Sequence, residues 1–267
     1  CGKTTLLWGL TGLHPFSGGE ALMLGSPMSA PRKDIGIIFQ QANLLPWRNL
    51  EQNILFPLEI MREDVGAHRA RVKKLLADVQ LDGFEKHYPR ELSGGMQKRV
   101  GLARSIALHP EIMLYDEPTT GVDPITGGAV DRLIKKMRDT IGVTSVVVTH
   151  DMRSAYRLAD RIAILNAGRL LTIGSLDELR QQYNPGAWVE IELLTPVELQ
   201  WTDLPGVIKS EGQERMIKVQ VKDINLVPAL VNSLVQHKAE ILRVSPQKTT
   251  LEDIYFKLQA EAREEQK

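Results

Sequence analysis

Two adjacent carboxylates, Asp116 and Glu117, follow the short apolar run Ile112–Tyr115. A run without polar alternation is typical of a strand buried on both faces of a parallel sheet. Its carboxyl end is the edge at which open α/β sheets bind ligands. One carboxylate there can hold Mg²⁺ while the next orients or deprotonates a water molecule. The pattern alone also fits a strand that ends in a solvated acidic turn, so the rest of the chain must decide between the two interpretations.

Residues that could bind phosphate open the chain, which begins Cys-Gly-Lys-Thr-Thr. Gly2, Lys3 and Thr4 match the end of the loop G-x-x-x-x-G-K-[ST], with Cys1 as its last variable position. The amides at the start of the next helix and the Lys3 ammonium can hold phosphate oxygens, and Thr4 can reach Mg²⁺. The spacing predicts that the first glycine of the loop precedes Cys1, so that the chain starts inside its own nucleotide site. A chance Gly-Lys-Thr tripeptide is the alternative.

Two further polar residues follow runs that read as strands. Gln40 comes after the apolar run at residues 34–39, and His150 comes after the β-branched run Val143–Thr149. Because strand ends in such sheets share one edge, we expect His150 beside Asp116. An amide or a histidine at a strand end can also serve only the backbone around it.

Residues 50–109 are predicted to be mainly helical. The positions that recur at the spacing of one helix face are Val72, Leu75, Leu76 and Val79. Ser93 is a natural N-cap for a later helix, and Gly94 and Gly95 would let a ligand approach its N-terminus. The alternative is a plain helix cap with no ligand. The position of this helix just ahead of the Asp116-Glu117 strand favours the ligand.

The pattern changes after the turn-forming cluster Tyr183–Gly186. Residues 188–193 and 217–222 alternate between apolar and polar side chains, as half-buried strands do. Helical faces follow within residues 227–234 and 251–258. Strands and two helices without a polar cluster indicate a small α/β module for regulation or dimer contact.

Size and composition fit an ordinary globular protein. The 267 residues are 43% hydrophobic and 25% charged, with a net charge of zero. Without a global positive field we expect no nucleic-acid partner. A single cysteine allows no internal disulfide and favours a reducing compartment. No apolar run approaches the length of a membrane helix, so a partner protein would have to supply any membrane crossing.

Together the motifs resemble the nucleotide-binding subunit of ATP-binding cassette (ABC) transporters, in an order and spacing far more specific than any single motif. The matching segments are Gly2–Thr5 for the end of the Walker A loop, Gln40 for the Q-loop, Leu92–Met96 for the ABC signature, Ile112–Pro118 for Walker B with its catalytic glutamate, Gly121–Asp123 for the D-loop and His150 for the switch histidine. The resemblance extends from Cys1 to about Gly174. The chain lacks the first Walker A glycine and the aromatic residue that stacks on adenine in this family.

The resemblance implies a role for each matching residue. Lys3 would hold the β- and γ-phosphates, Glu117 would act as general base, His150 would contact the γ-phosphate, and Gln40 would lie near the metal and the attacking water. The residues implied to bind ATP are Cys1, Gly2, Lys3, Thr4, Thr5, Ser93, Gly94, Gly95 and Asp123, and those implied to bind Mg²⁺ are Thr4, Asp116 and Gln40. Ser93 and Gly95 would act on ATP bound by a second copy.

The implied fold is an α/β P-loop NTPase of ABC type, with a mostly parallel sheet and a helical subdomain. We expect this ATPase domain at residues 1–185, its helical subdomain at about residues 50–108, and a small C-terminal α/β domain at residues 186–267.

The implied activity is ATP hydrolysis that drives transport through separate permease subunits, with the protein at the cytoplasmic face of the cell membrane as a homodimer. Residues 44–47 would contact the permease. The alternatives are a soluble ABC protein of DNA repair or translation and a regulatory subunit without turnover. Signals for the cargo disagree: residues 44–48 are similar to importers of small anions and sulfonates, residues 96–100, 123–126 and 144–152 to lipid-trafficking cassettes, and residues 250–255 to drug or polysaccharide exporters. They favour lipids or hydrophobic compounds.

Overall fold

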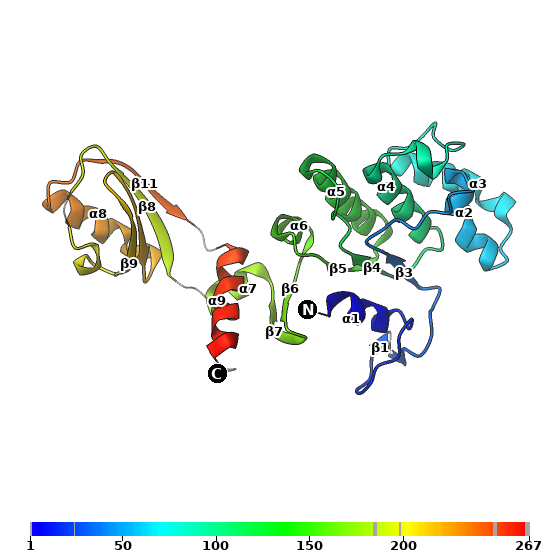
Figure 1. The fold of residues 1–267 in the computed structure, drawn as a ribbon, viewed down its shortest axis with the longest axis horizontal. Coiled ribbons are helices and arrows are strands. Elements are labelled where there is room, and N and C mark those ends of the chain that lie inside the picture. Colours follow the sequence, from blue (N-terminus) through cyan, green and yellow to red (C-terminus); the bar gives the residue numbers. More distant parts are fainter. Residues whose placement is uncertain (1, 24, 184–185, 198, 248–249, 265–267) are drawn as a thin grey trace. The chain divides into compact units, whose positions relative to one another are not determined.

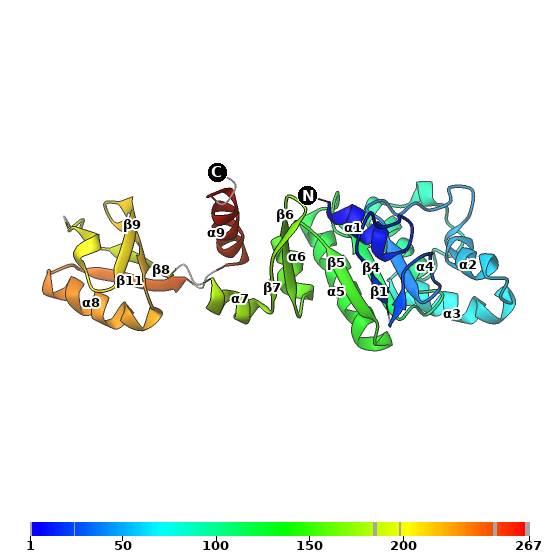
Figure 2. The same ribbon diagram turned by 90° about the horizontal axis from the view of Figure 1, so that it is seen from below.

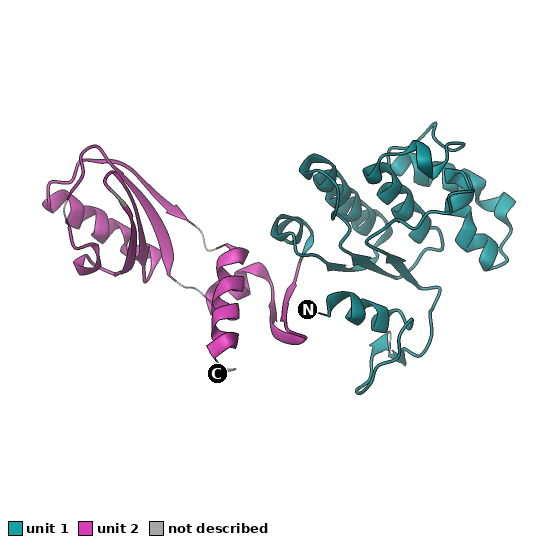
Figure 3. Ribbon diagram, viewed as in Figure 1, with its two compact units in different colours: residues 1–159 teal, residues 160–267 magenta. Residues whose placement is uncertain are grey.

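The computed structural model of the protein describes residues 2–23, 25–183, 186–197, 199–247 and 250–264. The chain forms two compact units, Cys1–Ala159 and Asp160–Lys267 (Figure 3). This division falls earlier than the boundary predicted at residues 185 and 186. Strands β6 (Ile162–Asn166) and β7 (Arg169–Gly174) pair with each other as a separate two-stranded antiparallel sheet, which explains why the first unit ends before them.

A parallel sheet in the order β3-β4-β5 lies at the centre of the first unit. Its strands are β3 (Ile35–Ile38), β4 (Ile112–Asp116) and β5 (Thr144–Val148). All five residues of β4 are buried, which confirms the strand predicted from the apolar run. Ile38 of β3 is level with Tyr115, and Asp116 is level with Val148 of β5. The segments that follow the three strands therefore leave the sheet at one edge.

The two faces of β4 are covered by different helices. Ile112 and Leu114 pack with Leu7 of α1 (Lys3–Leu10). Met113 and Tyr115, which alternate with them, belong to the larger core that α4 (Gly94–Ser105) and α5 (Pro124–Ile141) share. Accordingly α1 lies on one face of the sheet and α4 and α5 on the other (Figure 1), and α1 is drawn in front of the sheet in the turned view (Figure 2).

The remaining elements of the first unit are mainly helical. They are β1 (Leu22–Met23), β2 (Ser26–Pro27), α2 (Leu50–Ile60), α3 (Val65–Asp78), the short helix η1 (Pro89–Glu91), α4 (Gly94–Ser105), α5 (Pro124–Ile141) and α6 (Met152–Leu158). The four positions predicted to form one face of α3 and its end are all buried. They pack with residues of α2 and α4 in one core, which confirms the amphipathic helix. Asn49 begins α2 with a capping box that it forms with Gln52.

The second unit contains an antiparallel sheet in the order β11-β8-β10-β9. Its elements are α7 (Leu176–Gln182), β8 (Ala187–Leu193), η2 (Trp201–Asp203), β9 (Val207–Gln213), β10 (Met216–Val221), η3 (Ile224–Leu226), α8 (Val227–Gln236), β11 (Ile241–Gln247) and α9 (Leu251–Glu264). Val189, Ile191 and Leu193 of β8 are fully buried, and Leu230 and Leu234 of α8 share their core. This alternation confirms the predicted half-buried strands. No helix among the described residues is long and apolar enough to span a membrane.

Candidate functional site

The start of α1 brings a lysine and a threonine to the carboxyl edge of β4. Gly2 precedes the helix with φ of 78°, a left-handed conformation that glycine adopts without the steric cost of a Cβ atom. Lys3 Nζ lies 3.2 Å from Glu117 Oε1 and donates to the carbonyl oxygen of Thr149 at 3.2 Å. Thr4 Oγ1 donates to Asp116 Oδ1 at 3.1 Å. Residues more than one hundred positions apart thus meet at the predicted edge.

Glu117 is the centre of this cluster. Its amide donates to the carbonyl oxygen of Val148 at 2.8 Å, and its φ is 52°. This left-handed turn, uncommon for a residue with a side chain, ends β4 directly after Asp116. Oε2 accepts from Thr120 Oγ1 at 3.2 Å, lies 2.7 Å from His150 Nδ1, and is 3.3 Å from the His150 amide nitrogen.

These contacts set the charge of the Glu117 carboxyl. Burial raises its pKa, but the hydrogen bonds from His150 and Lys3 and the charge of Lys3 oppose that effect. The net result is a pKa below the ordinary value of 4.5. The side chain of Glu117 is 14% exposed, whereas that of His150 is 69% exposed. A carboxylate that is ionised at neutral pH is therefore held in a mostly enclosed position, with its histidine partner open to solvent.

Thr4 and Asp116 form a pair of hard oxygen donors that fits Mg²⁺. Asp116 is 3% exposed, and the Thr4 hydroxyl is directly beside it. Mg²⁺ at phosphate sites commonly takes only one or two protein carboxylates and completes its shell with water and phosphate oxygens. Within the described residues no group of three or more His, Cys, Asp or Glu side chains converges. The donor set therefore suits a phosphate-linked magnesium ion better than a metal caged entirely by protein.

Gln40 and Thr5 form no hydrogen bond with the cluster among the described residues. Gln40 lies two residues beyond the end of β3, at the edge where Asp116 ends β4, and it is exposed. Its side chain forms no hydrogen bond with the described residues. Thr5 is exposed on α1. Cys1 lies outside the described residues, so its predicted role is not addressed by the structure.

Ser93, Gly94 and Gly95 form a separate group at the start of α4. Ser93 Oγ accepts from the Met96 amide at 3.3 Å, which confirms the predicted N-cap. A Cβ atom at Gly94 would have no neighbour within 4 Å, so this face is open. A Cβ atom at Gly95 would lie 2.4 Å from Thr126 Cγ2, so the close approach of α4 to α5 requires glycine. The structure does not join these residues to the Lys3–Glu117 cluster by any hydrogen bond among its described residues.

Asp123 serves as the N-cap of α5. Its Oδ1 accepts from the amides of Ile125 at 3.1 Å and Thr126 at 3.0 Å. Hydrogen bonds from Thr126 and Ile125 hold the pKa of Asp123 below 3.8. This structural role is compatible with the predicted nucleotide contact, because the carboxylate is exposed.

Several residues that the sequence analysis did not single out form hydrogen bonds that hold the segments around the cluster. Thr120 contacts Glu117, and Lys98 of α4 donates to the carbonyl oxygen of Thr120. Asp131 of α5 is 1% exposed and accepts from Ser154 Oγ at 3.0 Å and from Arg157 Nη1 at 3.1 Å. That network fixes α6, which starts two residues after His150. Nothing in their local sequence distinguishes these residues from ordinary helix and turn positions.

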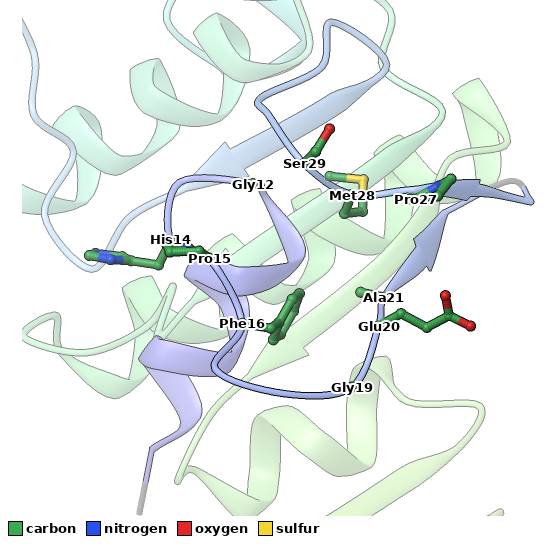
Figure 4. A pocket seen from close by; sticks show the side chains of 10 residues that line it. All are labelled: Gly12, His14, Pro15, Phe16, Gly19, Glu20, Ala21, Pro27, Met28 and Ser29. Carbon is green, nitrogen blue, oxygen red and sulfur yellow. The ribbon is translucent and has the colours of Figure 1, made fainter.

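A pocket of about 370 Å³ lies elsewhere in the first unit, between the loop after α1 and the β1-β2 hairpin (Figure 4). His14, Phe16, Glu20 and Met28 are among its lining residues. The Phe16 ring covers Gly9 of α1, where a Cβ atom would lie 2.6 Å from Phe16 Cε1. None of the predicted site residues lines this pocket, so the candidate site is the edge cluster.

Two families of known proteins match the chain. The family described as ABC transporter matches residues 1–120. The family described as the C-terminal domain of DrrA1-3-like ATP-binding proteins matches residues 174–258, within the second unit.

Curated relatives match the chain over 186 residues. Methionine import ATP-binding protein MetN of Corynebacterium glutamicum is 39% identical, over 67% of this chain and 52% of the relative. MetN of Xanthomonas euvesicatoria pv. vesicatoria is also 39% identical, over 67% of this chain and 56% of the relative. The chain therefore spans about half the length of the curated relatives it matches.

Solved structures of ATP-binding cassettes have the same fold. A dimeric, post-hydrolysis structure of the cassette MJ0796 bound to ADP and Pi is 33% identical, with a TM-score of 0.58 over 66% of this chain and 81% of that one. CbiO1 from Clostridium perfringens, part of the ABC transporter complex cbiONQ, is 26% identical, with a TM-score of 0.62 over 68% of this chain and 75% of that one.

Proposed function

The chain belongs to the ABC transporter family, and from this premise we propose that it is an ATP-binding subunit that hydrolyses ATP to drive transport through separate permease subunits. The observation that carries the proposal is the cluster at the end of β4. Lys3, Thr4, Asp116, Glu117 and His150 converge there from three segments through the contacts described above. Their chemistry is that of nucleoside triphosphate hydrolysis, which needs phosphate binding, a magnesium site and a base.

In this proposal, residues of α1 and of the end of β4 bind the phosphates and the metal. Lys3 and the amides at the start of α1 bind the β- and γ-phosphates, as expected for an ammonium beside a helix N-terminus. Thr4 and Asp116 would hold Mg²⁺, and Gln40 would be a further oxygen donor at the same edge. The metal, when bound, neutralises charge that develops on the phosphate oxygens.

In this proposal, Glu117 accepts the proton of the attacking water molecule. Its depressed pKa keeps the carboxylate ionised at neutral pH, so the form that can accept a proton from water is the one present. His150 keeps this carboxylate oriented through Nδ1 and remains exposed on its other side. That exposure lets the ring also contact the γ-phosphate of ATP.

A second copy of the chain completes the site in this proposal. Ser93 and Gly94 start α4 on an open surface and are not bonded to the Lys3–Glu117 cluster. A helix N-terminus with a hydroxyl is suited to stabilise a γ-phosphate, but here it must come from a partner. The similar cassette MJ0796 is described as dimeric with ADP and Pi, which supports a head-to-tail homodimer that encloses ATP.

The permease contact is proposed for residues 44–47. Trp47 is 71% exposed, whereas Asn53 behind the loop is fully buried and fixes Leu45. A rigid loop with an exposed aromatic side chain is suited to bind a partner. Through this contact the protein would be held at the cytoplasmic face of the membrane.

The cargo is proposed to be a lipid or hydrophobic compound, on the sequence similarities described above. The methionine importers among the relatives support a second candidate, a small polar solute that is imported. Reconstitution with the copurified permease distinguishes the two. Hydrolysis stimulated by methionine but not by phospholipid would favour import of the small solute, and the reverse would favour the lipid.

The proposed activity is tested by phosphate release from ATP, measured with the copurified permease complex. We expect release that requires Mg²⁺ and is lost in Lys3→Ala. Release that is absent from the wild type, or unchanged in Lys3→Ala, would refute the proposal. Copurification with DNA or ribosomes in place of a membrane protein would favour the soluble alternative.

A further inference from the structure

An arginine of α4 holds the loop that follows Gln40. Arg104 donates from Nη1 to the carbonyl oxygen of Asn43 at 2.8 Å and from Nη2 to that of Ala42 at 2.7 Å. Both bonds have the short lengths of the charge-assisted class, which is stronger than neutral bonds. The two carbonyls are consecutive, so one planar guanidinium fixes two successive peptide groups.

The surroundings of Arg104 indicate that this contact serves geometry. Its guanidinium has no carboxylate partner among the described residues, and only the two carbonyl oxygens accept from it. Half-buried charges are normally paired, because removing them from water is costly. Asn43 has φ of 46°, a left-handed turn conformation that asparagine adopts more readily than most other residues with a side chain. The arginine therefore stabilises one particular path of the loop.

Other contacts hold the loop close to α4 and α2. Gly101 of α4 lies beside it, and a Cβ atom there would be in ordinary van der Waals contact with Ala42 Cβ at 3.6 Å. Further along, buried Asn53 of α2 accepts from the Leu45 amide at 2.8 Å and donates to the Leu45 carbonyl oxygen at 3.2 Å. Gln40 stands between the end of β3 and this fixed segment, two residues before Ala42.

From these contacts we infer that Arg104 is a positioning residue for Gln40, because it ties the loop that carries Gln40 to the helix that begins with Gly94 and Gly95. The inference rests on the proposed function, in which Gln40 acts at the metal and the attacking water. Its consequence is mechanical. A displacement of α4 would move the peptide groups of Ala42 and Asn43, and with them the position of Gln40.

Arg104→Met tests this inference, with Arg99→Met as a matched control. Arg99 lies on the same helix and is also partly buried. Among the described residues it too donates only to carbonyl oxygens, those of Val79 at 3.1 Å and Gln80 at 3.4 Å. Its partners lie at the end of α3 and not in the loop that follows Gln40. We expect Arg104→Met to lower kcat of the permease complex roughly 10- to 100-fold, as misplacement of a catalytic group does. We expect KM for ATP to change by less than about threefold, because the phosphate contacts remain. Equal kcat losses in the two variants, or wild-type kcat in Arg104→Met, would overturn the inference.

Amide hydrogen exchange provides a readout that does not depend on hydrolysis. Residues 40–45 should exchange faster in Arg104→Met and at the wild-type rate in Arg99→Met. Exchange of this segment at the wild-type rate in Arg104→Met would show that Arg104 does not hold the loop and would overturn the inference. If the wild type releases no phosphate, the proposed function fails. The exchange experiment then still decides whether Arg104 holds the loop after Gln40. Should Arg104→Met not fold, Arg104→Lys is measured in the same way, because its ammonium keeps the charge but lacks the planar fork.

Discussion

Replacement of Glu117 by glutamine tests the proposed chemistry directly. The two side chains have the same shape, so the change removes the charge and one acceptor with little change in volume. In the structure Oε1 lies 3.2 Å from Lys3 Nζ, and Oε2 lies 2.7 Å from His150 Nδ1 and 3.2 Å from Thr120 Oγ1. An amide can accept at only one of these two positions and places an NH₂ donor at the other. Glutamine thus keeps part of the contacts but cannot take a proton from water.

The size of the effect follows from the role assigned to Glu117. A positioned general base contributes roughly 10²- to 10⁴-fold, which corresponds to about 2.7–5.4 kcal/mol of activation free energy. Binding of ATP should remain, because Lys3, Thr4 and the start of α1 supply the phosphate and metal contacts and are unchanged. We therefore expect the hydrolysis rate to fall by that factor while the Kd for ATP stays close to the wild-type value.

Single-turnover phosphate release and equilibrium ATP binding are the two measurements. Glu111→Gln is the matched control, because Glu111 immediately precedes the same strand at its opposite end and is exposed. It should hydrolyse ATP at the wild-type rate. Near-normal turnover in Glu117→Gln would remove Glu117 from the role of base. A comparable loss in Glu111→Gln would show that the effect reflects the strand rather than the reaction.

Three further outcomes follow from the packing of α4 and α5. Gly95→Ala should lower the free energy of unfolding by about 1–3 kcal/mol in urea titrations, because its Cβ atom would overlap Thr126 Cγ2. Adding Thr126→Ser, which removes that methyl group, should restore stability. Gly94→Ala should leave stability unchanged or increase it, because a Cβ atom there has open space around it. Asp123→Ala should lower the melting temperature at pH 7, where the wild-type carboxylate is ionised and caps α5. The pKa of this carboxyl is lowered in the folded protein, so its contribution to stability is present above the ordinary pKa of 3.8 and is lost as the pH falls through the folded pKa. A difference in melting temperature that does not shrink as the pH is lowered would contradict the capping role. Lys98→Met should slow hydrolysis more than it changes ATP binding, since Lys98 holds the Thr120 carbonyl beside Glu117; unchanged turnover would show that this contact is dispensable.

The elements of the first unit could be predicted because their signals are local. The apolar run of β4, the spacing of the buried face of α3 and the Ser93 cap each lie within a short window of sequence. The shared edge could also be predicted, since the carboxyl ends of parallel strands meet there. What these rules indicate is where a side chain emerges, and Lys3, Glu117 and His150 emerge where expected.

The contacts within the site could not be predicted in the same way. Glu117 leaves β4 with a positive φ, and in this conformation its backbone amide donates a hydrogen bond to the carbonyl oxygen of Val148 in the neighbouring strand. The need for glycine at position 95 comes from Thr126, which lies on another helix. The sequence does not indicate which unit β6 and β7 join, and in the described sheets they pair only with each other. In each case the decisive partner is distant in sequence.

The position of α4 between two parts of the site follows from its side chains. Near its start, Lys98 donates to the Thr120 carbonyl oxygen, and Thr120 in turn donates to Glu117. At its end, Arg104 donates to the carbonyl oxygens of the loop after Gln40. A helix is stiff along its axis because each turn is hydrogen-bonded to the next. Ser93 and Gly94 at the start of this helix are exposed. A second copy of the chain that contacts them, as proposed above, would therefore be connected through α4 to the base and to the glutamine.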